Sequence, residues 1–385
     1  MDAPTASPPA PPRQRTFPLK PLLAIAAFGA AGLALGYLLG KSAPELPWLR
    51  QKLDALTTLD LLVVPVLILL VLAAHELGHL LGGFSRGMRF LLLIVGPFQW
   101  TRAQHGVVFR WNRHLGLMGG LAAATPDPAQ PLVPQLRRVV AGGPLASLLL
   151  GVLGLAGGLW LDGRPGAYLV IFGFVSLGIF VVTALPLHAG GFMSDGMQFI
   201  ELRRGGASVS ERQILLRLMG SSLGGIRPRD WDPALVQEAA SIDGTVPMRS
   251  VAGRVFGLYH AMDRGDSAKL HEHATWLAQH LDGYPDGFRQ SIALELCLLA
   301  TLAGDLDGAR AWWQRSRGGV VDGARRSLVE ARLAALEGDA TRCAAALAKA
   351  RKALPRGMDP GLNQLTADQL DATGEDRRGL TAPAY

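Results

Sequence analysis

Four apolar stretches, each about long enough to cross a bilayer, constrain the fold of this 385-residue chain more than any other feature. A membrane-spanning helix needs about 20 mostly apolar residues. Runs of this kind extend over Pro21–Leu39, Leu61–Phe84, Val139–Leu161 and Ala167–Leu187. They explain why 49% of the residues are hydrophobic and only 18% are charged. After Arg203 the pattern becomes that of soluble helices, so the sequence predicts an all-α membrane bundle of about four spans followed by a soluble helical domain.

The start of the chain divides into a tail and an anchor. Residues 1–20 are rich in Pro and Ala, a composition typical of a disordered tail. The run Pro21–Leu39 is longer than a signal-peptide core and has no clear small-residue cleavage site, so we expect a retained membrane anchor rather than a signal peptide. The predicted parts are a disordered tail (1–20), a membrane-embedded domain (21–204) and a cytosolic helical domain (205–385).

Arginines in the short loops predict the orientation of the spans. Seven arginines lie between Ser85 and Arg138, whereas the turn between the last two runs has only Arg164. Because cytoplasmic loops carry the excess of Lys and Arg, we expect both termini in the cytoplasm of a multi-pass protein, in the cytoplasmic (inner) membrane. The basic residues of Gly40–Asp60 weaken this prediction of orientation without reversing it.

Composition also excludes several classes of protein. The net charge of +7 arises from arginines beside apolar runs, and no nucleic-acid motif accompanies them, so no nucleic-acid partner is expected. The two cysteines, Cys297 and Cys343, are far apart in the sequence, which excludes a disulfide scaffold and a cysteine-based zinc site.

The second apolar run contains three ionisable residues, within VLAAHELGHLLGG. Residues four apart lie on one face of a helix, so His75 and His79 can both direct a ring nitrogen to one metal ion, with Glu76 beside them to handle a proton. At about 1.5 Å per residue, His75 lies roughly 21 Å along the span, nearer its cytoplasmic end. Hydrogen bonding to neighbouring helices is the alternative, but the cost of placing three such groups in a membrane favours a metal site.

A catalytic zinc ion takes three protein ligands and leaves a position for water, so a third ligand is required. One known continuation of the motif places a histidine where this chain has Ser85. Asp195, in LPLHAGGFMSDGMQF, is the better candidate, because the orientation argument places it at the same end of the membrane as the histidines. Pro186 and nearby glycines break the helix and let the chain turn back. His188 is a rival ligand, and a turn or capping role is the alternative for Asp195.

At this point the chain, from Leu61 to Arg204, resembles the site-2 protease family of intramembrane zinc metalloproteases. The resemblance rests on HELGH in a span, on AGGPLASLLLG opening the next span and on LPLHAGGFMSDG closing the third core span. It implies three core spans and Zn²⁺ as the cofactor. It also implies His75, His79 and Asp195 as ligands and Glu76 as the catalytic residue.

The resemblance further implies a reaction and its partners. The expected activity is cleavage of a transmembrane segment of a membrane-protein substrate within the lipid bilayer, with zinc-activated water and proton transfer by Glu76. The chain departs from the family at Thr183, three residues before Pro186, and at Ser147, where asparagine is common in both motifs.

Two further patterns concern the shape of the membrane domain. The segments Gly87–Trp100 and Gly106–Gly120 contain β-type runs. By resemblance to the family we expect short strands at the membrane surface, where an edge can hold an extended substrate, with a plain structural hairpin as the alternative. Gly143, Ser147 and Gly151 form a ridge of small residues, which predicts close helix packing and says nothing of catalysis.

The C-terminal half shows a weakly repeated pattern. Gly304-Asp305 and Gly338-Asp339 lie 34 residues apart, and each precedes an alanine-rich amphipathic helix, while Gly265-Asp266 opens a less regular unit. A helix-turn-helix period of 34 residues resembles tetratricopeptide repeats, which usually bind other proteins. Two roles stay open for these helices: they bind a protein partner, or they serve only as a structural cap.

Two other functions compete with the intramembrane protease. A zinc protease could take its third ligand from a glutamate on a later helix, but the C-terminal half offers no convincing helix of this kind. From another class, a non-catalytic membrane scaffold would use its helical repeats to bind partners.

Overall fold

The computed structural model describes residues 46–103, 106–112, 119–127, 129–189, 192–243, 247–284, 289–318 and 321–381. They form two compact units, one of residues 76–143 and 183–381, the other of residues 46–75 and 144–182. The division falls inside two continuous helices, α3 (Val64–Phe84) and α4 (Leu132–Trp160). The expected tail over residues 1–20 and the first apolar run, Pro21–Leu39, lie outside the described residues.

Within the described residues, three helices are long and apolar enough to cross a membrane, which confirms the last three apolar runs as helices. They are Thr58–Phe84, where the 3₁₀ turn η2 (Thr58–Leu62) leads into α3, then α4, and α5 (Gly163–Ala184). The predicted end of the last helix was wrong, because Pro186 disfavours helical backbone at the residue before it and α5 stops at Ala184.

Helix α4 extends beyond the predicted apolar run at its start. The helix begins at Leu132 rather than Val139, so its first turns contain Arg137 and Arg138. Leu136, in these turns, is buried in a small core with Leu202 of α6 (Asp195–Arg204). Arg137 donates a hydrogen bond of 2.7 Å to the backbone carbonyl of Leu202. Tertiary packing therefore extends the helix beyond the apolar run that marks the span.

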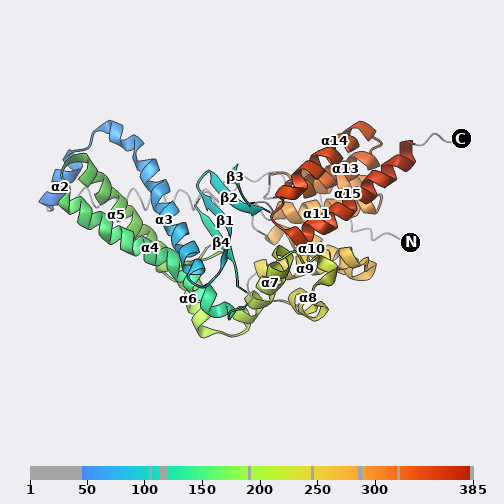
Figure 1. The fold of residues 1–385 in the computed structure, drawn as a ribbon, viewed down its shortest axis with the longest axis horizontal. Helices are drawn as coiled ribbons and strands as arrows, with labels where there is room; N and C mark the ends of the chain where they lie inside the picture. Colours follow the sequence, from blue (N-terminus) through green and yellow to red (C-terminus); the bar gives the residue numbers. More distant parts are fainter. Residues whose placement is uncertain are drawn as a thin grey trace. The chain divides into compact units, whose positions relative to one another are not determined.

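Helices α4 and α5 run side by side, joined by a short turn (Figure 1). Glycines permit this approach, because a Cβ added to Gly154 would meet the Cα of Gly173 at 3.0 Å and one added to Gly158 would meet Val170 at 2.6 Å. Large side chains such as Leu149 lie exposed on the outer faces. Many exposed leucines on one surface are typical of helices whose outer faces contact lipid.

A short helix closes one end of this unit. In α2 (Pro47–Asp54) the side chain of Leu49 is buried, and Lys52 is buried beside it. The Nζ of Lys52 donates to the carbonyl of Leu161, just after α4, at 2.6 Å and to Asp162 at 3.0 Å. A positive charge at the carbonyl end of a helix is favourable, so this contact fixes α2 against the turn between α4 and α5.

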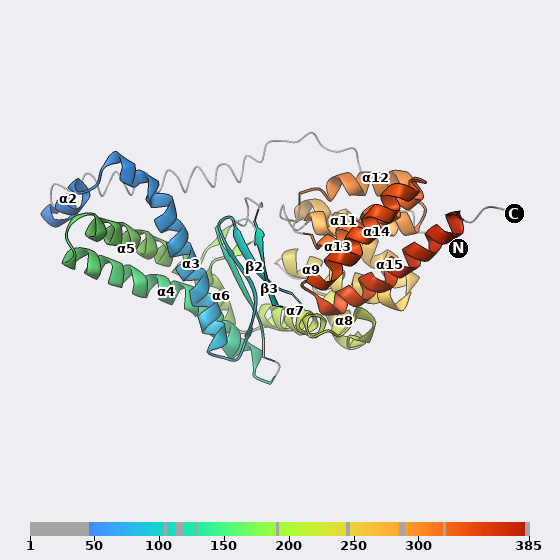
Figure 2. The same cartoon turned by 45° about the horizontal axis from the view of Figure 1, so that its top comes forward.

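The segment between α3 and α4 forms a four-stranded antiparallel sheet (Figure 2). Its strands are β1 (Arg89–Val95), β2 (Phe98–Ala103), β3 (Gly106–Trp111) and β4 (Leu121–Thr125), in the order β3-β2-β1-β4. Aromatic residues of β2 and β3 cluster on one face, with Trp100 and Phe109 centred 5.6 Å apart. The prediction of short strands is confirmed, although β4 begins only after the second predicted segment has ended at Gly120.

Two short paired strands and two helices follow α5. The strands β5 (His188–Ala189) and β6 (Phe192–Met193) pair antiparallel and lead directly into α6. Gly205 and Gly206, both with positive φ, then connect α6 to α7 (Ala207–Leu223). Only glycine adopts such backbone angles readily, so this pair lets the chain change direction after Arg204.

The described residues after α7 are mainly helical. Their elements are η4 (Pro228–Asp230), α8 (Pro233–Ala240), α9 (Pro247–Arg264), α10 (Ser267–His280), η5 (Leu281–Gly283), α11 (Arg289–Leu302), α12 (Leu306–Arg315), α13 (Gly323–Leu336), α14 (Ala340–Ala353), η6 (Leu354–Arg356) and α15 (Pro360–Thr381). Helices α11, α13 and α14 lie side by side (Figure 2). The main core contains Leu258, Leu277, Leu298 and Trp312.

One turn recurs at the three Gly-Asp pairs of the sequence. Gly265, Gly304 and Gly338 have φ between 69° and 76°. The aspartate after each glycine is the N-cap of the next helix and accepts a backbone hydrogen bond from the residue three positions later. Helix pairs α9/α10, α11/α12 and α13/α14 are thereby formed, while the likeness to tetratricopeptide repeats stays a prediction.

Candidate metal centre

Helix α3 carries the ionisable trio on its buried side. His75, Glu76 and His79 are 4%, 8% and 9% exposed, whereas Leu77 and Leu81 on the same stretch are 45% and 65% exposed. The helix therefore presents leucine outward and the two histidines inward. This arrangement follows from the four-residue spacing of the histidines, which places them one turn apart on one face.

Asp195 is the first residue of α6, and Ser194 before it is the N-cap. The Ser194 hydroxyl accepts from the backbone N–H of Leu187 at 2.9 Å and donates to the carbonyl of Leu185, so it ties the hairpin to the end of α5. Gly196 completes the turn, because a Cβ there would lie 1.9 Å from the carbonyl oxygen of Ala184. The local chain geometry thus fixes the position from which the Asp195 side chain projects.

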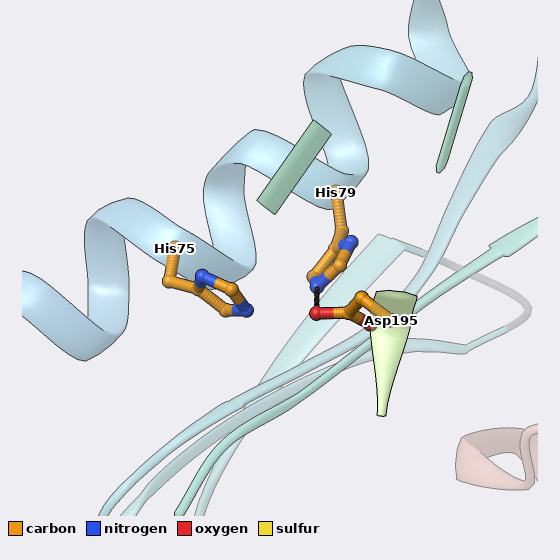
Figure 3. A group of neighbouring side chains, drawn as sticks. All are labelled: His75, His79 and Asp195. Atoms are coloured by element: carbon orange, nitrogen blue, oxygen red, sulfur yellow. Dashed lines mark ion pairs between the residues drawn. The ribbon is translucent and has the colours of Figure 1, made fainter. Parts of the chain in front are cut away.

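The three candidate ligands come together. One ligand atom each from His75, His79 and Asp195 lie within 4.8 Å of one another, and Asp195 Oδ2 is 3.4 Å from His79 Nε2 (Figure 3). Atoms bound to one tetrahedral zinc ion at about 2.1 Å stand about 3.4 Å apart. Two imidazoles and a carboxylate are a donor set that zinc accepts, so these residues fit the ion that the sequence implies.

For His188, the rival third ligand, the structure does not describe the side chain. His188 begins β5. Ser85, which occupies the place of a third histidine in the extended motif, instead donates its hydroxyl hydrogen to the carbonyl of Gly82.

Each histidine has a hydrogen-bond partner at Nδ1. His79 Nδ1 lies 2.7 Å from the carbonyl oxygen of Val139, and His75 Nδ1 lies 2.9 Å from the hydroxyl of Ser147. A carbonyl oxygen only accepts, so Nδ1 of His79 carries a proton, and in the neutral ring Nε2 keeps the lone pair that a metal ion needs. That nitrogen is the one that faces Asp195.

Glycine brings α3 and α4 unusually close at this level. A Cβ added to Gly142 would lie 2.1 Å from the carbonyl oxygen of Gly78, and one added to Gly143 would lie 2.3 Å from His79 Nε2. The ridge of small residues on α4 therefore has more than a packing role. Gly143 faces His79 and Ser147 faces His75, while Gly151 packs against Leu177 of α5.

Glu76 lies against the start of β4. A Cβ added to Gly120 would be 2.3 Å from Glu76 Oε1, and the backbone N–H of Ala122 donates a hydrogen bond to the carboxylate. Among the described strands β4 is an edge of the sheet, paired with β1 on one side only. The carboxylate is thus held next to an edge strand as well as on the histidine helix.

Sequence reasoning missed the surroundings of the trio. Ser147 and Gly143 had a usable signal, since they share the four-residue ridge that marks a close helix crossing. The carbonyl of Val139 had none, because any residue supplies a backbone oxygen. Gly120 also had none, because its contact with Glu76 depends on the path of the chain after the sheet turns back.

A family model described as peptidase family M50 matches residues 63–357. The match spans most of the chain, and the protein belongs to this family, the site-2 protease family. It is therefore a metallopeptidase, and the three long apolar helices among the described residues indicate a membrane protein. Neither the curated proteins nor the solved structures gave a match to the chain.

Proposed function

We propose that this protein is an intramembrane zinc endopeptidase that cleaves a transmembrane segment of another membrane protein. The observation that carries the proposal is the group of His75, His79 and Asp195 on and beside a membrane-capable helix, with Glu76 next to the first histidine. His75, His79 and Asp195 would hold the ion. When bound, zinc acidifies water and polarises the carbonyl of the peptide bond to be cut.

Glu76 is the proton carrier in this proposal. Its carboxylate takes a proton from the attacking water and delivers it to the nitrogen of the leaving amine. The hydrogen bond from the N–H of Ala122 and the close approach of Gly120 restrict where the carboxylate can move. A restricted carboxylate stays within proton-transfer reach of water in the centre, which lowers the entropic part of the barrier.

The edge of β4 that no described strand pairs with is the proposed seat of the unwound substrate. A transmembrane helix must be unwound before its backbone can be cut, and an added strand satisfies the exposed N–H and C=O groups of the unwound segment. Of the two edges of the described sheet, β4 is the one in contact with Glu76. A substrate strand added to β4 would therefore pass beside the carboxylate.

The domain and membrane assignments belong to the same proposal. Residues 21–204 would form the membrane-embedded protease and residues 205–385 a cytosolic, tetratricopeptide-like helical domain that binds a protein partner. Both termini would be cytoplasmic in the inner membrane, as the arginine-rich segment Ser85–Arg138 favours. Reporter fusions at residue 162 and at the C-terminus test this, and a cytoplasmic signal at residue 162 would contradict it.

The variant Glu76→Gln tests catalysis separately from metal binding. It keeps the size of the side chain and removes its basicity, so we expect zinc content to stay unchanged and cleavage to fall by a factor of about 10² to 10⁴. A substrate trapped on this variant can be identified by mass spectrometry. Were the protein a scaffold, its cellular phenotype would persist in the variant.

The variant Asp195→Ala tests the third ligand. We expect zinc content to fall well below one ion per chain, since only two protein ligands would remain. Asp54→Ala, which removes an exposed carboxylate on α2, is the matched control and should retain its zinc. Full zinc and full activity in Asp195→Ala would exclude this residue as a ligand.

A further inference from the structure

The hydroxyl of Ser147 lies at the back of the candidate centre. Ser147 is 1% exposed, and its Oγ is 2.9 Å from Nδ1 of His75. Figure 3 shows the ring of His75 with its other nitrogen turned toward Asp195. The serine therefore contacts the side of the imidazole that faces away from the ligand group.

The two histidines differ in the kind of partner they have. The carbonyl of Val139 accepts only, so it dictates the tautomer of His79. A serine hydroxyl both donates and accepts. His75 can present Nε2 as a ligand only when its Nδ1–H is the donor and Ser147 the acceptor, because a neutral imidazole has one protonated nitrogen.

We propose that Ser147 is a positioning residue for the metal centre, whose hydroxyl accepts from Nδ1–H of His75 and so holds the ring with Nε2 toward His79 and Asp195. This proposal rests on the zinc site proposed above. It assigns to the side chain a task that its place in a ridge of small packing residues does not require. Outer partners of metal-binding histidines fix ring orientation, and their removal typically costs 10- to 100-fold in metal affinity.

A second buried serine, Ser176 on α5, contacts the backbone of Ser147 rather than its side chain. The Oγ of Ser176 donates to the backbone carbonyl of Ser147 at 2.8 Å, and Ser176 is fully buried. Two buried serines on adjacent helices thus share one hydrogen bond, and the hydroxyl of Ser147 contacts the ring of His75, whereas that of Ser176 contacts the backbone of Ser147. Ser176→Ala is therefore a matched control, since it makes the same chemical change at the same level of the bundle.

The experiment measures zinc affinity of the full-length chain in detergent micelles by dialysis against graded chelator, with zinc counted by elemental mass spectrometry. The variants are Ser147→Ala, Ser147→Thr and Ser176→Ala, each first checked for a monodisperse, helical state. Cobalt substitution gives a second readout, because the visible absorption bands of Co²⁺ report the arrangement of its ligands. Neither measurement requires a known substrate.

We expect Ser147→Ala to weaken zinc binding by about 10- to 100-fold and to shift the cobalt bands, with Ser176→Ala close to the wild type. Recovery in Ser147→Thr, which restores the hydroxyl, supports the proposal further. Equal affinity in Ser147→Ala and wild type, or an equal loss in both alanine variants, overturns it. If zinc binding by the wild-type chain did not depend on His79, the proposed protease function would fail instead. The two failures are therefore distinct.

Discussion

Replacing Gly143 by alanine should disable the candidate metal centre while leaving the fold intact. The added Cβ would lie 2.3 Å from His79 Nε2 and 2.5 Å from Cε1, whereas ordinary contact begins at 3.4 Å. The ring must therefore move by roughly 1 Å. Its Nδ1 is held by the carbonyl of Val139 at 2.7 Å, so this movement also strains that hydrogen bond.

The size of the effect follows from the tolerance of metal coordination. Bond lengths at a zinc site vary by only about 0.2 Å, so a displacement of roughly 1 Å removes His79 from the ligand set or forces the other ligands to follow. We expect zinc affinity to fall by at least about 100-fold. Alanine favours a helix over glycine by about 1 kcal/mol, so a weaker helix cannot explain such a loss.

The assay is the zinc content of the full-length chain after dialysis against graded chelator. Gly178→Ala is the matched control, because it lies on α5 and a Cβ there meets nothing within 4 Å. The control should bind zinc like the wild type. If Gly143→Ala retained wild-type zinc affinity, the close approach of α4 to His79 would have no bearing on the centre, and the reasoning from its geometry would fail.

Two further predictions concern the C-terminal helices. The ion pair of Arg325 with Glu295 has side chains 4% and 5% exposed, so Arg325→Ala should destabilise these helices by about 3 to 5 kcal/mol, against about 0 to 1 kcal/mol for Arg351→Ala at an exposed pair. Thermal unfolding followed by circular dichroism compares them, and equal losses would contradict the burial argument. Burial favours the neutral carboxyl of Asp263, but hydrogen bonds, chiefly from Arg227, hold its pKa below the usual value. A depressed pKa stabilises the fold above the unfolded value of about 3.9 and loses this effect as the pH falls through the folded value, so the stability gap between wild type and Asp263→Asn should shrink in acid. A gap independent of pH would argue against this ion pair.

The sequence predicted the elements that follow from local pattern. Apolar runs located three helices, and the spacing of His75 and His79 placed them on one face, because helical periodicity depends on the chain alone. The ends of α4 and α5 were less predictable. One is extended by packing against Leu202, a contact with a residue far along the chain.

The position of Asp195 illustrates what sequence can and cannot supply. Counting arginines was enough to expect it at the same end of the membrane as the histidines. The 3.4 Å approach of Asp195 to His79 depends on a hairpin, a serine cap and the close contact of Gly196 with Ala184. None of these has a periodic signal, since each is set by the path of the backbone in three dimensions.

The ridge on α4 has a consequence for how tolerance to substitution should be interpreted. Gly143, Ser147 and Gly151 share one stripe, although two of them border the histidines and the third borders Leu177 and Gly173 of α5. Saturation mutagenesis would show the same intolerance at all three positions, alternating with permissive sites such as the outward-facing Leu145 and Leu149. Survival data alone would therefore label the whole stripe as a packing seam, and only a readout of bound metal would separate the neighbours of the ion from the spacers between helices.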